Sequence, residues 1–259
     1  MKNENEGKRK VRVSKGEIME EKVERLIGVY RRGVPRQRRL LCLQVVLAAV
    51  VTAAMVLVCA SDGRSALSGR EDTTIVDEWA SIKSPPAPKL AEVTVEVSET
   101  ALLVLDIQNG NCNPSRRPRC VASLGKIQGL LSRARANGMA VVYSLTRSAS
   151  ASEVRKELSP IAGEPIVKSG VDKFFGTELE KILRDRGIRV VILVGTSAHG
   201  AVLHTATGAA LRGLKVLVPV DGMSASERYA EQYTAWHLVN GPGSRRATTL
   251  TKMSLIRFK

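Results

Sequence analysis

The segment Val190–Asp221, which reads VVILVGTSAHGAVLHTATGAALRGLKVLVPVD, determines the fold class of this chain. It begins with an apolar run typical of a strand that is buried on both faces of a parallel sheet. A tight glycine turn and a helix of small residues follow, and then a second apolar run that ends at Asp221. The helix begins directly behind a strand end, where its first backbone N–H groups face whatever occupies the crevice. This pattern predicts an α/β fold with a ligand site at the turn.

The same alternation of strands and helices continues through residues 93–259. Apolar residues at helical spacing from Leu124 to Ala134 predict a helix that ends at Asn137-Gly138. Thr177–Glu180 and Ser224–Glu227 have the composition of capping boxes, so each predicts a helix start. Strands that alternate with helices imply a doubly wound, mostly parallel sheet in a three-layer α/β fold. The predicted strands are Ala101–Ile107, Met139–Leu145, Val190–Val194, Lys215–Val220 and Thr248–Arg257, and the longest predicted helix is Val121–Ala136.

Residues 40–61, LLCLQVVLAAVVTAAMVLVCAS, contain no charged side chain. A run of this length is sufficient for one helix to cross a hydrocarbon core of about 30 Å. A buried core helix is usually shorter and carries more polar residues, and a cleaved signal peptide usually has a much shorter polar segment before its apolar region. We therefore expect one transmembrane helix over residues 40–61, in front of the α/β domain.

The charges on either side of this run predict its orientation. An arginine cluster between Arg31 and Arg39 precedes the run, and the positive-inside rule then leaves the N-terminus in the cytosol and the C-terminal domain in a lumen or outside the cell. Much of the net charge of +15 lies before the run, where Tyr30 is the sole aromatic residue, so we expect no nucleic-acid partner. The expected divisions are a basic cytosolic tail (1–39), the span (40–61), a Pro- and Ser-containing linker (62–92) and the α/β domain (93–259).

Two charged residues lie where a doubly wound sheet binds its ligands, at the carboxyl ends of its strands. Asp106 comes at the end of a buried apolar run, where a charge is costly unless it is paired or used. Lys168 ends a short apolar segment in PIVKSGVDKFFGTEL. Each residue also has an ordinary interpretation, since Asp106 could cap the next turn and Lys168 could be solvated.

These segments resemble the isochorismatase-like superfamily, which includes nicotinamidases, carbamoylsarcosine amidases and related cysteine hydrolases. The superfamily's Asp-x-Gln motif is matched by Asp106-Ile107-Gln108, and the D-x-F segment that follows its catalytic Lys is matched by Asp172-Lys173-Phe174, after Lys168. The Thr-Ala pair on its helix is matched by Thr205-Ala206. The resemblance spans residues 93–259 and implies a Rossmann-like fold in which Asp106 and Lys168 form a catalytic pair.

The same resemblance places Ala201 where most of these enzymes have a nucleophilic cysteine, four residues before the Thr-Ala pair. The isochorismatases proper also lack this cysteine, and an Ala-His pair that they carry is matched by Ala198-His199. Their reaction hydrolyses a vinyl ether, in which the Asp protonates the enol-ether carbon and water adds to the resulting cation. The resemblance therefore implies a hydrolase in which Ala201 contributes only its backbone N–H.

The resemblance also suggests which residues surround the substrate. Gln108, Ser197 and His199 are candidate substrate-binding residues, and we expect His199 to be a turn residue or pocket wall rather than a base. A cis peptide bond between Thr196 and Ser197 is expected, because the corresponding turn of the family has one. It would aim the N–H groups of Ser197 and Ala201 at one spot.

Other features of the family have no match in this chain. The arginine and tryptophan that isochorismatases carry after the catalytic Lys, around a dianionic substrate, are replaced by Ser169-Gly170. The metal-binding Asp and His residues of nicotinamidases have no counterpart in Tyr143–Ser150. We therefore expect neither a metal nor another cofactor, and the substrate is not identified.

Two cysteines of the α/β domain enclose the segment NCNPSRRPRC. Cys112 follows Asp106 closely enough that a displaced nucleophile is conceivable. We instead expect a disulfide between Cys112 and Cys120, provided that the domain faces an oxidising compartment.

Two functions remain open at this point. The first is a membrane-anchored hydrolase that acts on a small molecule, a vinyl ether or an amide, with Asp106 as proton donor or base. The second is a catalytically inactive descendant that binds a small molecule or a protein through the same crevice. Members of the superfamily commonly assemble, so a homo-oligomer is compatible with either function.

Overall fold

The computed structural model describes residues 73–259, and the predicted span over residues 40–61 lies outside the described residues. The chain divides into two units, residues 1–83 and 84–259, which are described separately. The described end of the first unit holds the short helix α3 (Ile75–Glu78), which Thr74 and Asp77 cap reciprocally, and a 3₁₀ turn, Trp79–Ser81. None of the helices within residues 73–259 combines the length and the hydrophobicity needed to cross a bilayer.

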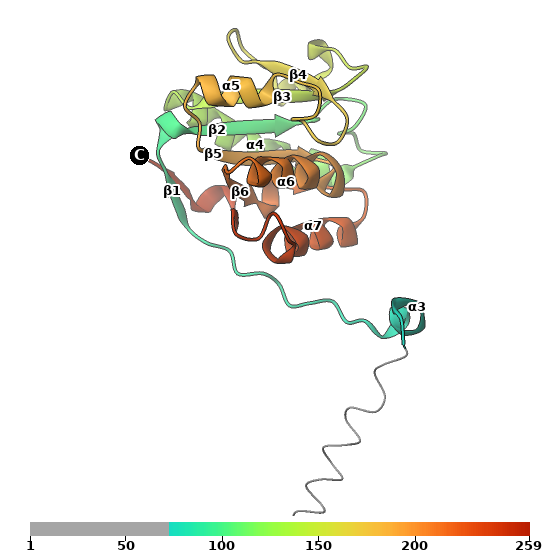
Figure 1. The fold of residues 1–259 in the computed structure, drawn as a ribbon. Helices are drawn as coiled ribbons and strands as arrows, with labels where there is room; N and C mark the ends of the chain where they lie inside the picture. Colours follow the sequence, from blue (N-terminus) through green and yellow to red (C-terminus); the bar gives the residue numbers. More distant parts are fainter. Residues whose placement is uncertain (1–72) are drawn as a thin grey trace, which may run out of the picture. The chain divides into compact units, whose positions relative to one another are not determined.

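The second unit is built around a parallel sheet (Figure 1). Six of its strands lie in the order β4-β3-β2-β5-β6-β8, and the short β7 pairs with the end of β5. Every pairing between these strands is parallel, so the predicted doubly wound parallel sheet is confirmed. The strands are β2 (Thr100–Leu105), β3 (Ala140–Thr146), β4 (Ile166–Ser169), β5 (Val190–Thr196), β6 (Lys215–Pro219), β7 (Met223–Ser224) and β8 (Thr248–Thr251).

Helices cover both faces of this sheet. Alternate residues of β2 enter two separate cores: Leu103 and Leu105 face one layer of helices, whereas Leu102 and Val104 face the other. The first layer contains α5 (Leu179–Asp185), α6 (Leu203–Leu211) and α7 (Arg228–Asn240), and the second contains α4 (Pro118–Ala136). All six residues of β2 are buried, which is why its sequence is continuously apolar rather than alternating.

The order of the strands places a topological switch point between β2 and β5. From β2 the chain moves outward through β3 and β4, and it then returns to the other side of β2 for β5, β6 and β8. Ligands of such sheets bind outside the carboxyl ends of the strands at this point. The residues that follow Leu105 and Thr196 are therefore the first place to look for a site.

Two predicted elements differ from the observed ones. The single strand predicted over Thr248–Arg257 is split into β8 and β9 (Ile256–Phe258) by a 3₁₀ turn, where the backbone N–H of Met253 donates to Asp221 Oδ1 at 3.0 Å. β9 pairs instead with β1 (Val93–Val95) in a separate two-stranded sheet.

The second difference concerns the segment Ser224–Glu227, which does not form a capping box. Ser224 lies in β7 opposite Thr196, and α7 begins only at Arg228. The carboxylate of Glu231 reaches back to accept the backbone N–H of Ala225 at 2.9 Å. The helix predicted after Thr177 is present as α5, but the capping box is not: the helix begins at Leu179 with Glu178 as its N-cap, and Thr177 Oγ1 accepts the N–H of Leu179 at 3.1 Å.

Candidate active site

Asp106 follows β2 directly and lies at the centre of the sheet's carboxyl edge. Its backbone has φ of 53°, a left-handed conformation that is uncommon for a residue other than glycine and that is concentrated at functional sites. The residue is 5% exposed. Ser144 Oγ, at the end of β3, donates to its Oδ1 at 3.0 Å. Asp106 is thus held in a fixed position with one carboxylate oxygen facing the next element of the site.

Lys173 supplies the partner of this carboxylate. Its side chain is 0% exposed, and its Nζ lies 2.8 Å from Asp106 Oδ2. Nζ also donates to the carbonyl oxygen of Gly170 at 2.6 Å. The lysine is fixed from α6 as well, since its backbone N–H donates to Thr205 Oγ1 at 3.2 Å. A lysine is almost never buried this completely unless its charge is paired, so the Asp106–Lys173 pair is a built feature of the fold.

The prediction that Asp106 pairs with Lys168 is wrong, because the lysine that reaches Asp106 is Lys173. Lys168 lies in β4, where Val167 and Ser169 are buried and Lys168 between them is exposed. Side chains of a strand point alternately to opposite faces, so Lys168 points away from the face that its two neighbours share. Lys173 had been assigned only as the middle residue of the Asp172–Phe174 segment, although it is the residue that reaches Asp106.

The surroundings of Asp106 shift its titration to higher pH. Burial raises the pKa of the Asp106 carboxyl, and this effect outweighs the opposing influence of the Lys173 charge and of the hydrogen bonds from Lys173 and Ser144. A carboxyl group that retains its proton at higher pH can act as a general acid, and its conjugate base can take the proton back.

The carboxyl end of β5 lies next to that of β2 at the same edge of the sheet. The peptide bond between Thr196 and Ser197 is cis, as predicted. The backbone then enters a π-helical turn, Ala198–Val202, which continues into α6. A Cβ atom at Gly200 would lie 2.5 Å from Ser197 Oγ, so a larger residue there would force the Ser197 side chain to move.

Ala201 lies in this turn and is 3% exposed. Its methyl group packs in the core that also contains Leu203 and Ala206. The position carries no side-chain atom that could attack a substrate.

The remaining predicted residues have separate surroundings. Gln108 is buried and bridges β2 to β3, because its Nε2 donates to Thr146 Oγ1 at 2.9 Å and its Oε1 accepts the Thr146 N–H at 3.1 Å. His199 is exposed and lines a pocket of about 450 Å³ between the start of α6 and α7. The other two histidines of the chain, His204 and His237, line the same pocket. No group of three or more His, Cys, Asp or Glu residues within residues 73–259 has the arrangement of a metal site.

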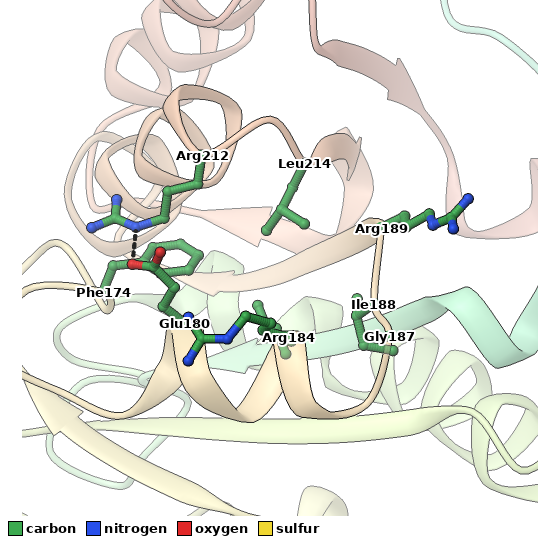
Figure 2. A pocket seen from close by; sticks show the side chains of 9 residues that line it. Phe174, Glu180, Arg184, Gly187, Ile188, Arg189, Arg212 and Leu214 are labelled. Carbon is green, nitrogen blue, oxygen red and sulfur yellow. Dashed lines mark hydrogen bonds and ion pairs between the residues drawn. The ribbon is translucent and has the colours of Figure 1, made fainter.

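A second pocket lies away from the site (Figure 2). It has a volume of about 320 Å³, and its lining includes Gly187–Arg189 and Leu214, which lead into the amino ends of β5 and β6. Arg212 crosses it to pair with Glu180 at 2.8 Å. Because ligands of this fold class bind at the carboxyl ends of the strands, this pocket is not the candidate active site.

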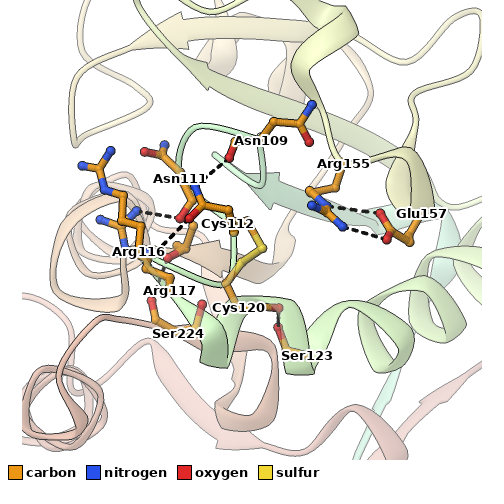
Figure 3. The surroundings of a disulfide bond; sticks show 12 residues. Asn109, Asn111, Cys112, Arg116, Arg117, Cys120, Ser123, Arg155, Glu157 and Ser224 are labelled. Carbon is orange, nitrogen blue, oxygen red and sulfur yellow. Dashed lines mark hydrogen bonds and ion pairs between the residues drawn. A yellow bond between two sulfur atoms is a disulfide. The ribbon is translucent and has the colours of Figure 1, made fainter.

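The loop that follows Asp106 is closed by a disulfide (Figure 3). Cys112 and Cys120 are bonded, as predicted, with their Cα atoms 5.4 Å apart. Arg117 lies inside this ring and is near enough to Asp106 that each charge shifts the pKa of the other group. Arg117 ends no strand and lies in none of the matched motifs, so the sequence contains no signal for it.

The isochorismatase domain, as defined for its family, matches residues 100–251 of the chain. The chain belongs to the isochorismatase family. A secreted isochorismatase effector of Verticillium dahliae is 29% identical to it over 142 residues, which cover 50% of this chain and 75% of the relative. Solved structures of the family share the fold at lower identity.

An isochorismatase family protein from Desulfovibrio vulgaris has 22% identity and a TM-score of 0.54, and the match covers 60% of this chain and 95% of that one. A cysteine hydrolase from Pseudomonas syringae has 20% identity and a TM-score of 0.56, with 65% and 95% covered. An N-carbamoylsarcosine amidase from Thermoplasma acidophilum has 24% identity and a TM-score of 0.52, with 60% and 96% covered. These likenesses establish an isochorismatase-like α/β hydrolase fold.

Proposed function

We propose that this protein hydrolyses a small molecule at the switch point between β2 and β5, with Asp106 as proton donor or base and Lys173 as its charged partner. The observation that carries the proposal is the buried pair itself, in which Lys173 Nζ lies 2.8 Å from Asp106 Oδ2. A buried ion pair need not stabilise a fold, since well-packed apolar residues in its place often give equal or greater stability. Its location at the ligand-binding edge of the sheet supports a functional role.

The absence of a nucleophile at position 201 favours a vinyl ether as substrate over an amide. In that reaction the Asp106 carboxyl transfers its proton to the terminal carbon of the C=C bond, and the electrons of that bond form the new C–H bond. The resulting oxocarbenium ion takes up water, which returns a proton to the Asp106 carboxylate. The hemiketal then collapses to a ketone and an alcohol. No covalent intermediate with the protein is needed, so Ala201 is no obstacle.

Turnover measurements with an Asp106→Asn variant test this proposal. The full-length chain is assayed with isochorismate, nicotinamide and small amides, and the matched control is Asp185→Asn, on the exposed surface of α5. Loss of a general acid costs about 10²–10⁴-fold in rate, whereas the control should keep the wild-type rate. Circular dichroism of both variants shows whether the fold is retained. Equal activity of Asp106→Asn and the wild type would contradict the proposal.

The alternative, an inactive binding module, is the outcome if none of these compounds is hydrolysed while the folded protein binds one of them. The two functions then differ in the effect of Asp106→Asn, which would alter affinity but no rate.

We further propose that residues 40–61 anchor the chain in a membrane and that the hydrolase domain faces a lumen or the cell exterior. The disulfide between Cys112 and Cys120 supports an oxidising compartment. The relative from Verticillium dahliae is described as secreted, which supports the same side of the membrane. Protease protection of the domain in sealed microsomes tests the orientation, and a single shortened product after signal-peptidase treatment would instead indicate a cleaved signal.

A further inference from the structure

Ser144 binds Asp106 through two separate contacts. The two residues meet where β2 and β3 end, since Leu105 pairs with Ser144 in the parallel register of these strands. The backbone N–H of Asp106 donates to the carbonyl oxygen of Ser144 at 3.0 Å. The Ser144 hydroxyl group donates in turn to Asp106 Oδ1, also at 3.0 Å. Ser144 therefore holds both the backbone and the carboxyl group of Asp106.

The side chain of Ser144 is unusual for its surroundings. Ser144 is 1% exposed, and the part of β3 around it, from Val141 to Leu145, is otherwise rich in apolar residues. Serine is mostly found on the surface, and a buried hydroxyl group costs free energy unless it forms a hydrogen bond. Packing alone would favour an apolar side chain at this position. The hydrogen bond to Asp106 explains why a serine is present instead.

The two oxygen atoms of the Asp106 carboxyl group have different partners. Oδ2 lies 2.8 Å from Lys173 Nζ, an ammonium group that has hydrogen atoms to donate and no lone pair to accept one. A proton on Oδ2 would therefore be repelled by the lysine. Oδ1 faces the Ser144 hydroxyl group, which takes only one of its lone pairs. The proton of a neutral Asp106 is accordingly best accommodated on Oδ1.

The charged groups that act on Asp106 leave this assignment unchanged. Lys173 Nζ also donates to the carbonyl oxygen of Gly170 at 2.6 Å, which keeps the ammonium group beside Oδ2. Arg117 acts on Asp106 through its charge, while its Nη1 donates to the carbonyl oxygen of Asn111 at 3.2 Å. Within residues 73–259, the hydrogen bond to Oδ1 comes from Ser144.

We propose that Ser144 is a positioning residue for proton transfer from Asp106: it holds Oδ1, the oxygen that carries the proton, and stabilises the carboxylate that remains after the transfer. A hydrogen bond to a charged carboxylate is stronger than one to a neutral carboxyl group, so the contact favours release of the proton. It lowers the pKa that burial of Asp106 raises. The inference rests on the proposed function for the statement that a substrate receives the proton.

Carbon-13 NMR of the Asp106 carboxyl carbon measures this contact without any substrate. The full-length chain is labelled at its aspartate carboxyl groups, and the Asp106 signal is the one that is absent in Asp106→Asn. In Ser144→Ala the carboxylate loses its hydrogen bond, so the pKa of Asp106 should rise further, with the acid dissociation constant falling about 3–10-fold. The backbone contact between the two residues does not depend on the side chain at position 144, and circular dichroism checks that the fold is retained.

Further substitutions separate the hydrogen bond from packing. Ser144→Thr keeps the hydroxyl group and should titrate like the wild type. Ser144→Cys fills nearly the same space with a weak donor, so the pKa of Asp106 should rise almost as far as in Ser144→Ala. The matched control is Ser244→Ala, because Ser244 is 0% exposed and donates to the carbonyl oxygen of Gly241 at 3.4 Å, beyond the end of α7. An Asp106 titration that is unchanged or moves to lower pH in Ser144→Ala and Ser144→Cys would overturn the proposal.

Turnover supplies a second measurement. In Ser144→Ala, kcat/KM at low pH should fall about 3–10-fold, because a weaker acid transfers its proton more slowly. The pH above which kcat/KM declines should move upward together with the pKa of Asp106. Ser144→Thr should restore both properties. A loss of kcat/KM that is equal at every pH would indicate a purely structural role and would overturn the proposal.

The NMR titration separates this inference from the proposed hydrolysis. If the titration of Asp106 depends on Ser144 but none of the assayed compounds is hydrolysed, the hydrolase proposal fails, whereas the control of Asp106 by Ser144 stands. If hydrolysis depends on Asp106 but Ser144→Ala titrates and reacts like the wild type, the hydrolase proposal stands and the role of Ser144 is refuted.

Discussion

The ends of β2 and β5 lie side by side at the carboxyl edge of the sheet, yet they differ in what they retain. At the end of β2, Asp106 is buried, has a left-handed backbone and pairs with Lys173 at 2.8 Å. At the end of β5, the turn has a cis peptide bond between Thr196 and Ser197, but Ala201 offers no reactive atom. The end of β2 therefore supplies the paired charged side chains, whereas the end of β5 supplies only backbone groups.

This difference indicates which of the two strand ends takes part in the proposed reaction. An unneeded buried ion pair could be replaced by apolar residues at little cost, whereas a turn that shapes the backbone must be kept for the fold whether or not it bears a nucleophile. The combination is consistent with an acid-catalysed hydrolysis by water and is poorly suited to covalent catalysis.

Replacing the lysine that pairs with Asp106 should have the largest effect. Lys173→Met leaves the Asp106 carboxyl buried without its cation, so we expect activity to fall at least about 100-fold and the free energy of unfolding to fall by about 3–5 kcal/mol. Lys168→Met is the control, because Lys168 is exposed and its loss should change stability by less than about 0.5 kcal/mol. Urea unfolding and turnover rates measure both effects. A larger loss of activity in Lys168→Met than in Lys173→Met would restore the lysine predicted from the sequence motif.

The pH dependence should show which form of Asp106 acts. Burial raises the pKa of this carboxyl above its value in the unfolded chain, so the folded state keeps the proton to higher pH. If Asp106 is the proton donor, kcat/KM should fall about tenfold per pH unit above this raised pKa. A rate that rises with pH through the same range would assign Asp106 as a base instead.

Stability should respond to the same titration. Between the unfolded and folded pKa values the native state binds more protons, so the stability that Asp106 contributes is fully present below the unfolded pKa and is lost as pH rises through the folded pKa. Asp106→Asn should remove this contribution to the pH dependence. Urea unfolding at a series of pH values, with both chains, provides the measurement.

The fold was largely predictable because its strands are buried on both faces. Ala101–Ile107 is apolar except for Asp106, and Val190–Val194 is apolar throughout; β2 and β5 lie there with boundaries that differ by two residues at most. The segment after Thr248 was not predictable from its apolar pattern, since its division into β8 and β9 depends on a distant contact between Met253 and Asp221. Local sequence does not contain such a contact.

Only the site residue that directly follows a predicted strand could be predicted from the sequence. Asp106 follows directly from the end of a buried run. The lysine was misassigned because a motif fixes the order of residues but not the face on which each one lies. In β4 the burial of Val167 and Ser169 turns Lys168 outward, and the loop after β4 then carries Lys173 back to Asp106. Arg117 was not predicted because it ends no strand and lies in none of the matched motifs.

The smallest expected effect concerns the end of β5, and Ala201→Cys reveals whether its electrostatics survive. The side chain lies in a helical run that begins at Ala198 and continues through α6, so the positive end of the helix favours a thiolate. If the pKa of the new thiol falls from about 8.5 to about 7, the thiolate fraction at pH 7 rises about 15-fold, and alkylation by iodoacetamide should accelerate by roughly tenfold over an ordinary thiol. Ala210→Cys, near the far end of α6, is the matched control because the helix there disfavours a negative charge. Ala201→Gly, by contrast, should leave hydrolysis within about twofold of the wild type, since the acid-catalysed route uses no side-chain atom at this position. Equal alkylation rates at positions 201 and 210 would show that the end of β5 does not stabilise an anion. The proposed reaction would then depend only on the residues at the end of β2.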